Sequence, residues 1–348
     1  MNPYTLIIFF TALGLGTTLT FLSSHWLLAW MGLEMSTLAI IPLMAQHHHP
    51  RATEAATKYF ITQAAAAAML LFAAISNTWM TGQWSITQIM HPLPNSLLIL
   101  ALALKLGLAP THIWLPEVLQ GLDLTTGMIL STWQKLAPFA LLLQIHESNP
   151  HLLLILGLTS ILIGGWGGLN QTQLRKILAY SSIAHLGWMV MIMQFSPSMA
   201  LMALLTYIAM TSSTFMIFNF TKSTTTNALA TSWTTAPVVT ALAPLALLSL
   251  GGLPPLTGFM PKWLIIQELT KQQLAPVATA AALAALLSLY FYLRLTYSMA
   301  MTISPNNTPA TAPWRLTSKN SVMPLSLTLI MALMLLPATP TIMALAMT

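Results

Sequence analysis

Long apolar runs occupy most of this 348-residue chain, and short polar or proline-containing stretches separate them. A helix that crosses a lipid bilayer needs about 20 predominantly apolar residues, and the runs are of about that length. With breaks placed at the polar stretches, the pattern predicts eleven spans, near residues 3–22, 25–45, 54–79, 95–119, 123–145, 151–169, 174–194, 198–221, 237–268, 275–300 and 323–346. The sequence therefore predicts an all-α polytopic membrane protein of about eleven transmembrane helices.

Composition agrees with this pattern, because 56% of the residues are hydrophobic, the mean hydropathy is +0.75 and only 5% are charged. Soluble domains contain about 25% charged residues, so we expect a single transmembrane domain over residues 1–348. The net charge is +6, but the lysines and arginines are scattered, which argues against nucleic-acid binding. Without cysteine the chain offers no thiolate ligands for iron–sulfur clusters, so redox chemistry is expected elsewhere.

The distribution of basic residues predicts the orientation of the chain in the membrane. Residues 1–10 carry no basic leader and are interpreted as the start of the first span, not as a signal peptide. With eleven spans, the opposite side has only Lys271, and the loops on the N-terminal side hold Arg51, Arg175, Lys176, Lys222, Arg315 and Lys319. The positive-inside rule then places the N-terminus on the side where translation occurs and the C-terminus on the other side.

A short internal repeat suggests that the chain has two related halves. Residues 107–117, GLAPTHIWLPE, align with residues 252–262, GLPPLTGFMPK, so that Pro110 matches Pro255 and Pro116 matches Pro261. Proline removes a backbone donor and disrupts the helix, so each half should contain a broken helix. Broken helices at matching positions are typical of ion paths in transporters. We therefore predict two inverted repeats, about 1–145 and 151–300, followed by a last helix at about 323–346, with simple kinking as the alternative.

Four ionisable residues fall inside the predicted spans: Glu34, Lys105, Lys135 and Lys262. A charge at the bilayer centre costs at least about 3 kcal/mol, so each needs a partner or a change of protonation state. A structural ion pair between helices would account for one acid and one amine. Three amines with a single central acid leave a surplus, and we therefore interpret the set as a proton relay.

Two histidines are further candidates for the relay, because neutral imidazole both donates and accepts hydrogen bonds. His112 lies between the two prolines of the first break, and His185 lies inside a later span. Either side chain is also compatible with ordinary helix packing. The run from His47 to His49 has no carboxylate or cysteine at ligand spacing, so we predict a solvated loop and no metal site. The chain contains no phosphate loop or nucleophile motif, so we expect no catalytic residue.

Five segments together resemble a known family. They are WMGLEMSTLAIIP around Glu34, LKLGLAPTHIWLPEVLQG around Lys105, STWQKLAP around Lys135, QLRKILAYSSIAHLGWM around His185 and GGLPPLTGFMPKW around Lys262. These segments extend over most of the chain. They resemble the subunit 2 family of the mitochondrial NADH:ubiquinone oxidoreductase, among the antiporter-like proton channel subunits of respiratory complex I.

The resemblance implies an eleven-helix subunit of the membrane arm, without the three leading helices of its bacterial relatives. Its location would be the mitochondrial inner membrane, with the N-terminus in the matrix and the C-terminus in the intermembrane space. Glu34 would be the acid coupled to the neighbouring channel, Lys105 its partner, Lys135 the central relay and Lys262 the exit-side amine. The chain would act enzymatically only as part of the proton-translocating NADH:ubiquinone reductase.

The resemblance also implies which molecules the chain meets and which it does not bind. NADH, FMN, iron–sulfur clusters and ubiquinone are expected on partner subunits, and this chain would hold no cofactor. Its partners would be other membrane-arm subunits, accessory subunits and membrane lipids. Two alternatives remain, namely a stand-alone cation/proton antiporter and a structural scaffold that pumps no protons. Copurification with redox subunits would argue against the first, and hydrated cavities at the lysines would argue against the second.

Overall fold

The computed structural model describes residues 2–46, 49–87, 91–145, 150–234, 236–301, 323–341 and 344. In these ranges the chain forms helices joined by short connections. The β pairing there consists of two isolated bridges, one between His25 and Ser85 and one between Gln173 and Thr225. The prediction of an all-α protein is confirmed.

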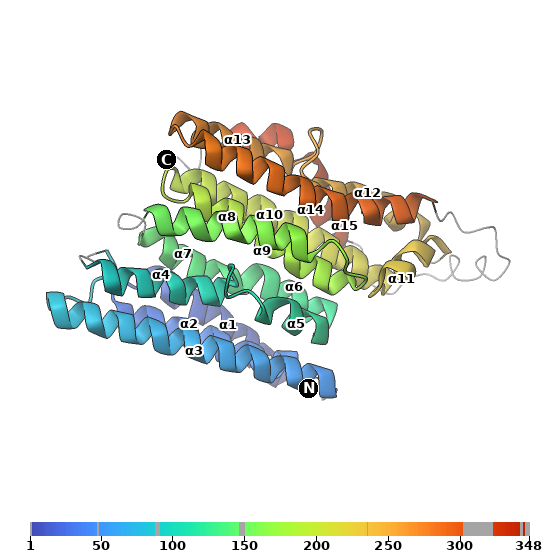
Figure 1. Cartoon of the computed structure of the whole chain (residues 1–348). Helices are drawn as coiled ribbons and strands as arrows, with labels where there is room; N and C mark the ends of the chain where they lie inside the picture. The colour runs from blue at the N-terminus through green and yellow to red at the C-terminus, as the bar shows by residue number, and fades with distance from the viewer. Residues whose placement is uncertain are drawn as a thin grey trace. The chain divides into compact units, whose positions relative to one another are not determined.

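The chain divides into two compact units, Met1–Thr159 and Ser160–Thr348, and the division falls within α8 (Pro150–Gly167). Unit 1 also contains α1 (Pro3–Leu22), α2 (Trp26–Met44), α3 (Pro50–Thr81), α4 (Pro92–Leu106), α5 (Trp114–Gly121), α6 (Leu124–Thr132), the 3₁₀ turn η1 (Trp133–Lys135) and α7 (Leu136–Gln144). In Figure 1, α3 runs alongside both α4 and α5, and α3 packs against each of them.

Unit 2 is built around α9 (Leu174–Ile192), in which every residue from Ser181 to Ile192 is buried. Its other elements are α10 (Pro197–Thr221), α11 (Thr226–Ala230), η2 (Thr231–Thr234), α12 (Pro237–Gly251), α13 (Phe259–Lys271), α14 (Ala275–Met301), α15 (Met323–Met334) and η5 (Leu336–Ala338). Helix α9 packs against α10, α13 and α14, while α12 packs against α10, α14 and α15. A helix that is apolar and buried all round is typical of the centre of a bundle.

The helices agree with the predicted spans in most places. Within the described residues, α1, α2, α3, α10 and α14 are long and apolar enough to cross a membrane, and α4, α8, α12 and α15 are shorter apolar helices. The sequence did not predict the short elements α11 and η2. The last span was predicted as one helix over 323–346, but α15 ends at Met334 and a 3₁₀ turn containing Pro337 follows. Residues 342–343 and 345–348 lie outside the described residues, and the total of eleven spans stays a prediction.

Helices α1 and α2 approach each other closely at two glycines. A Cβ atom on Gly16 would lie 2.7 Å from the carbonyl oxygen of Gly32 and 2.8 Å from the backbone nitrogen of Ser36. A Cβ atom on Gly32 would in turn lie 2.8 Å from the carbonyl oxygen of Gly16. Small residues at such crossings let membrane helices pack backbone to backbone. This contact fixes the position of α2, the helix that carries Glu34.

The two predicted helix breaks are present, and glycine begins each of them. Gly107 caps the end of α4 and Gly252 caps the end of α12, both in the left-handed conformation, with φ of 80° and 83°. In each case the glycine N–H donates to carbonyls of the preceding turn, and the next residue donates to the same turn. This is a helix C-cap that favours glycine. The prolines act afterwards, because Pro110 and Pro255 lie three residues beyond the glycines.

The second proline of each break has a different role from the one that the sequence suggested. Pro116 and Pro261 lie in the first turns of α5 and α13. The backbone N–H groups of a first turn have no partner within the helix, so proline costs little there. These prolines are therefore compatible with the restarted helix and do not interrupt it. The inverted relation between the two halves stays a prediction.

A third interruption was not predicted. The run 123–145 contains α6 and α7 with the 3₁₀ turn η1 between them, and Lys135 is the last residue of that turn. Pro138 lacks the N–H that would bond to the carbonyl of Gln134 four residues earlier. The irregular turn therefore has a local cause, and it lies next to a buried lysine.

The close contact between α1 and α2 can be tested with two glycine substitutions. We expect Gly16→Ala to destabilise the protein by about 1–3 kcal/mol, because the added methyl group meets backbone atoms that cannot move aside. Gly14→Ala is the control, since no atom lies within 4 Å of a Cβ at that position. The measurement is the thermal unfolding of protein from the native membrane. Equal stability of the two variants would contradict the packing described.

Candidate functional site

Glu34 and Lys105 form a loose ion pair inside unit 1. Glu34 lies in the middle of α2, and Lys105 lies in the last turn of α4. The Lys105 Nζ atom is 3.7 Å from Glu34 Oε1, too far for a hydrogen bond, and the Lys105 side chain is only 1% exposed. The Thr37 hydroxyl donates to the Glu34 backbone oxygen at 3.0 Å and lies 3.4 Å from its Oε2 atom. The predicted acid and its predicted partner are thus brought together.

The end of α4 compensates part of the Lys105 charge. The last carbonyl groups of a helix carry partial negative charge and favour a cation in the last turn. The Trp114 indole N–H, from α5, donates to the carbonyl of Leu104 at 3.1 Å. Helix α5, which follows the break, therefore supplies a hydrogen-bond donor to a carbonyl group at the end of α4.

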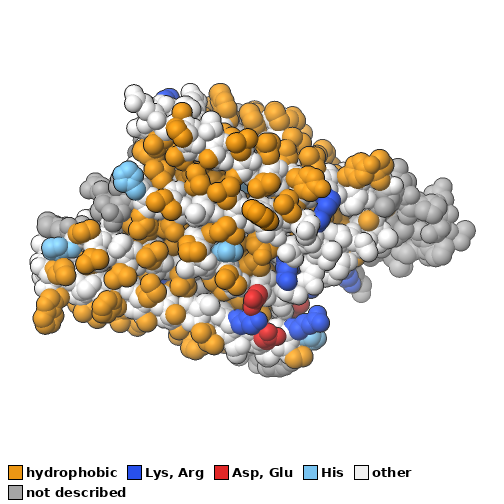
Figure 2. All heavy atoms as spheres, viewed as in Figure 1, with side chains coloured by type: hydrophobic (Ala, Val, Ile, Leu, Met, Phe, Trp, Pro, Cys, Tyr) orange, Lys and Arg blue, Asp and Glu red, His pale blue; other side chains and the backbone are white. Residues whose placement is uncertain are grey.

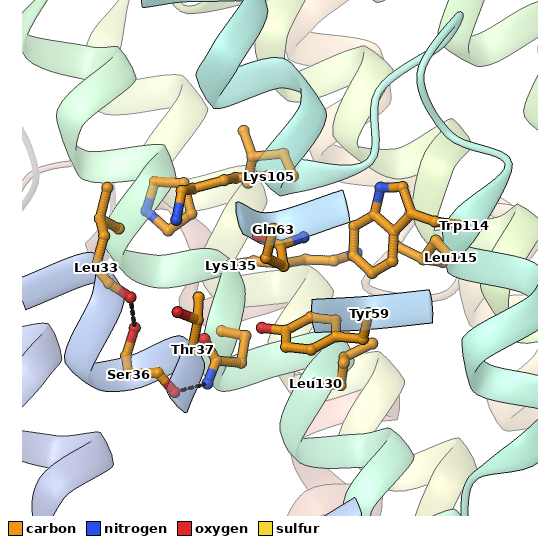
Figure 3. Close-up of a pocket in the computed structure, with 13 residues that line it drawn as sticks. Leu33, Ser36, Thr37, Tyr59, Gln63, Lys105, Trp114, Leu115, Leu130 and Lys135 are labelled. Carbon is orange, nitrogen blue, oxygen red and sulfur yellow. Dashed lines mark hydrogen bonds between the residues drawn. The ribbon is translucent and has the colours of Figure 1, made fainter. Parts of the chain in front are cut away.

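Lys105 and Lys135 line the same small cavity, whose volume of about 10 Å³ is about that of one water position. Lys135 is 3% exposed, so the end of its side chain is removed from bulk solvent. Figure 3 shows side chains from α2, α3, α4, α5 and η1 around this space. The Gln134 side chain donates to the backbone oxygen of Ser36 at 2.9 Å and so connects the irregular turn to α2.

The sequence did not identify several polar or aromatic residues that line this cavity, among them Tyr59, Gln63 and Gln134. Tyr59 and Gln63 lie on the buried face of α3. A signal for Gln63 was available, because it is the one amide in the apolar run FITQAAAAAML, and polar residues in membrane helices are usually functional. Tyr59 and Gln134 gave no comparable signal, since tyrosine and glutamine are common near membrane interfaces and helix ends.

Lys262 is placed at the second break, in unit 2. Its Nζ atom donates to the carbonyl oxygen of Gly251, the last residue of α12, at 2.7 Å. Within the part of the chain that the structure describes, Lys262 makes no ion pair with a carboxylate. A Cβ atom on Gly252 would lie 3.0 Å from both Cδ and Nζ of Lys262, so glycine leaves room for the amine. Lys105 and Lys262 thus both lie at a helix break, but a bond from the amine to a helix-end carbonyl is present at Lys262.

The two candidate histidines are in different surroundings. His185 is buried in α9, and its ring centroid lies 5.6 Å from that of Tyr207 on α10. His112 is partly exposed within the first break, where its Nδ1 atom lies 3.3 Å from the carbonyl of Pro110. It is not among the residues that line the cavity of Lys105 and Lys135.

The shortest ion pairs among the described residues lie at the surface of unit 1. Lys58 Nζ is 2.8 Å from both Glu54 and Glu117, and all three side chains are largely exposed. Figure 2 shows acidic and basic side chains together at one edge of a face that is otherwise mostly apolar. Exposed pairs of this kind contribute little to stability. We interpret them as a polar end of α3 and α5, outside the lipid.

No group of three or more potential metal ligands occurs among the described residues. His49 accepts a hydrogen bond from the backbone N–H of Arg51 and caps α3, which is a structural role. His47 and His48, the other members of the predicted solvated loop, lie outside the described residues.

Comparisons with known proteins cover almost the whole chain. The family described as "NADH:quinone oxidoreductase/Mrp antiporter, TM" matches residues 23–288, and "NADH dehydrogenase subunit 2 C-terminus" matches residues 289–343. The chain is 68% identical over 345 residues to NADH-ubiquinone oxidoreductase chain 2 of Tetraodon nigroviridis and 67% identical over 345 residues to that of Gadus morhua. Each match covers 99% of this chain and 99% of the relative.

Solved structures contain the same fold. A chain of respiratory complex I from Thermus thermophilus has a TM-score of 0.82 at 28% identity, covering 99% of this chain and 78% of that chain. A chain of the Mrp complex from Dietzia sp. DQ12-45-1b has a TM-score of 0.80 at 15% identity, covering 96% of this chain and 75% of that chain. At such low identity the second likeness concerns the fold alone.

The room that Gly252 leaves for Lys262 can be tested with a matched pair of substitutions. Gly252→Ala adds about 1–2 kcal/mol of left-handed backbone strain and also brings a methyl group against the Lys262 amine. Gly82→Ala adds similar strain, since φ is +73°, but meets no atom within 4 Å. We expect a larger fall in melting temperature for Gly252→Ala. An equal fall in melting temperature for the two variants would show that the contact between residue 252 and Lys262 does not affect stability.

Proposed function

Because the chain belongs to the family of NADH-ubiquinone oxidoreductase chain 2, we propose that Glu34, Lys105, Lys135 and Lys262 carry protons across the membrane within that complex. Family membership confirms the resemblance noted in the sequence. The chain is a membrane subunit of respiratory complex I and takes part in an enzyme as a component of that oxidoreductase. The observation that carries the proton-relay proposal is the buried cavity shared by Lys105 and Lys135, beside Glu34.

We place the chain in the mitochondrial inner membrane, with its N-terminus in the matrix and its C-terminus in the intermembrane space. The names of its relatives support the location, and the excess of lysine and arginine on one side of the predicted topology supports the orientation. NADH, FMN, the iron–sulfur clusters and ubiquinone are assigned to partner subunits. The absence of cysteine supports that assignment for the clusters. The partners are other membrane-arm subunits, accessory subunits and lipids.

The relay begins with the Glu34–Lys105 pair. When Glu34 is ionised, its charge stabilises the ammonium form of Lys105, and when Glu34 is neutralised this support is lost. Two ammonium groups around one small buried cavity repel each other strongly. Protonation of Lys105 therefore disfavours protonation of Lys135, and the two sites titrate as a coupled pair. A change of charge at Glu34 thus alters the proton occupancy of Lys135.

A proton that enters from the matrix side is proposed to load onto Lys135 and to leave near Lys262. The contact of Lys262 with the Gly251 carbonyl, without a carboxylate among the described residues, supports a site whose charge is held by a dipole. His112 and His185 remain candidates for connecting groups. The correspondence of the Gly107 and Gly252 caps supports the proposal of two inverted repeats.

The two alternative functions make different demands on the same residues. A stand-alone cation/proton antiporter would share the fold, as the likeness to a chain of the Mrp complex illustrates. The full-length identity to chain 2 relatives favours a subunit of the oxidoreductase complex. A scaffold that pumps no protons would not need a cavity between two buried lysines, and it is separated from a pump by the following test.

Lys105→Met should leave an assembled complex in which proton translocation per NADH oxidised falls severalfold. The reason is that methionine fills the same space but cannot alternate between two charge states. Glu34→Gln should act in the same direction, because it removes the charge that controls Lys105. The measurement is the ratio of protons moved to NADH oxidised in proteoliposomes that contain the purified complex.

Arg175→Gln is the matched control, since Arg175 lies at the start of α9 and outside the cavity. We expect it to lower the yield of assembled complex and to leave the proton ratio of each complex unchanged. A normal ratio for Lys105→Met, or an equal loss for all three variants, would refute the relay assignment.

A further inference from the structure

The cavity that Lys105 and Lys135 line has a further polar group on its wall, the side-chain amide of Gln63. Gln63 lies on α3, is 4% exposed and lines the cavity together with Lys105 and Lys135. Figure 3 draws Gln63 with Lys105, Lys135 and Tyr59 among the residues that line this cavity. Helix α3 packs against α2, α4 and α5, so this position is held by neighbours on three elements.

Polar atoms at this cavity lack hydrogen-bond partners in the described part of the protein. They are the Nε2 atom of Gln63 and the Nζ atom of Lys105, and the neighbouring Oε1 atom of Glu34 is in the same condition. A buried donor without a partner costs about 1–3 kcal/mol, and a buried water is one partner that satisfies such atoms. The cavity has room for about one water molecule.

We propose that Gln63 is a positioning residue that holds a water molecule between Lys105 and Lys135, so that a proton passes between the amines through it. This proposal rests on the relay function proposed above. The water accepts hydrogen bonds from the Lys105 ammonium group and from the Gln63 amide. Its two lone pairs are then occupied, and its hydrogens point toward acceptors elsewhere on the cavity wall.

The neutral Lys135 amine is an acceptor on that wall. In the transfer, an N–H bond of Lys105 breaks as a new O–H bond forms on the water, and the water releases one of its original hydrogens to Lys135. Lys105 becomes neutral, Lys135 becomes an ammonium group, and the water is regenerated, so atoms and charge balance. Gln63 itself gains and loses no proton. Its effect is to fix the orientation of the water.

Two substitutions at Gln63 distinguish the effect of its polar amide from the effect of its side-chain size. Gln63→Met keeps the length of the side chain and removes the amide, whereas Gln63→Asn keeps the amide and removes one methylene group. The proposal predicts a severalfold fall in protons moved per NADH oxidised for Gln63→Met, with most of the ratio retained by Gln63→Asn. A purely structural role predicts the opposite order, because methionine packs in the space of glutamine and asparagine leaves a gap.

Gln194→Met is the matched control. Both side-chain polar atoms of Gln194 are also buried without hydrogen-bond partners among the described residues, but Gln194 does not line this cavity. The same chemical change at that position should leave the proton ratio unaltered. The rate of proton translocation should also slow more in D₂O for Gln63→Met than for the unaltered complex, because the transfer through water then limits the rate.

A structure of the intact complex that resolves water molecules provides a second test, independent of activity. A water within hydrogen-bond distance of both Gln63 and Lys105 supports the proposal, and direct contact between these two side chains with no water overturns it. If Gln63→Met pumps normally while Lys105→Met does not, only the role of Gln63 is refuted. If Lys105→Met also pumps normally, the relay function itself fails.

Discussion

A positive charge buried among apolar helices must be compensated, and in this chain Lys105 lies beside Glu34 whereas Lys262 donates to the carbonyl at the end of an interrupted helix. Moving an ammonium group out of water costs several kcal/mol. Lys105 occupies the last turn of α4, and Lys262 binds the terminal carbonyl of α12. The carbonyls at a helix end have no partner within the helix and carry partial negative charge. Buried amines are therefore tolerated here without a tightly bound carboxylate.

This use of helix ends explains why the interruptions and the lysines occur together. Gly107 and Gly252 end the two helices in a conformation that other residues adopt only with strain, and Pro138 accompanies the irregular turn at Lys135. Each interruption exposes backbone groups that a continuous helix would satisfy. In lipid such groups are acceptable only where they face protein or a polar cavity. The cavity beside Lys105 and Lys135 meets that requirement for the first half.

The ion pairs of unit 1 differ in exposure and in the distance between the charged groups. Lys58 makes contacts of 2.8 Å with two exposed carboxylates, whereas the buried Lys105 stands 3.7 Å from Glu34. A close, fully hydrogen-bonded buried pair would hold both groups in their charged forms. The longer separation leaves each group sensitive to the charge of the other and to a water between them. That sensitivity is what the proposed relay requires.

The sequence alone determined the fold class, the family, the two broken helices and the pairing candidates Glu34 and Lys105, because apolar run lengths, prolines and isolated charges are local signals. It did not reveal the cavity. Gln63, Tyr59 and Gln134 become important only because α3 and η1 face α4 across it. Likewise, only the tertiary structure showed that glycine ends α4 and α12 and that Trp114 bonds to the carbonyl of Leu104. Such contacts depend on helix packing, which a sequence pattern does not encode position by position.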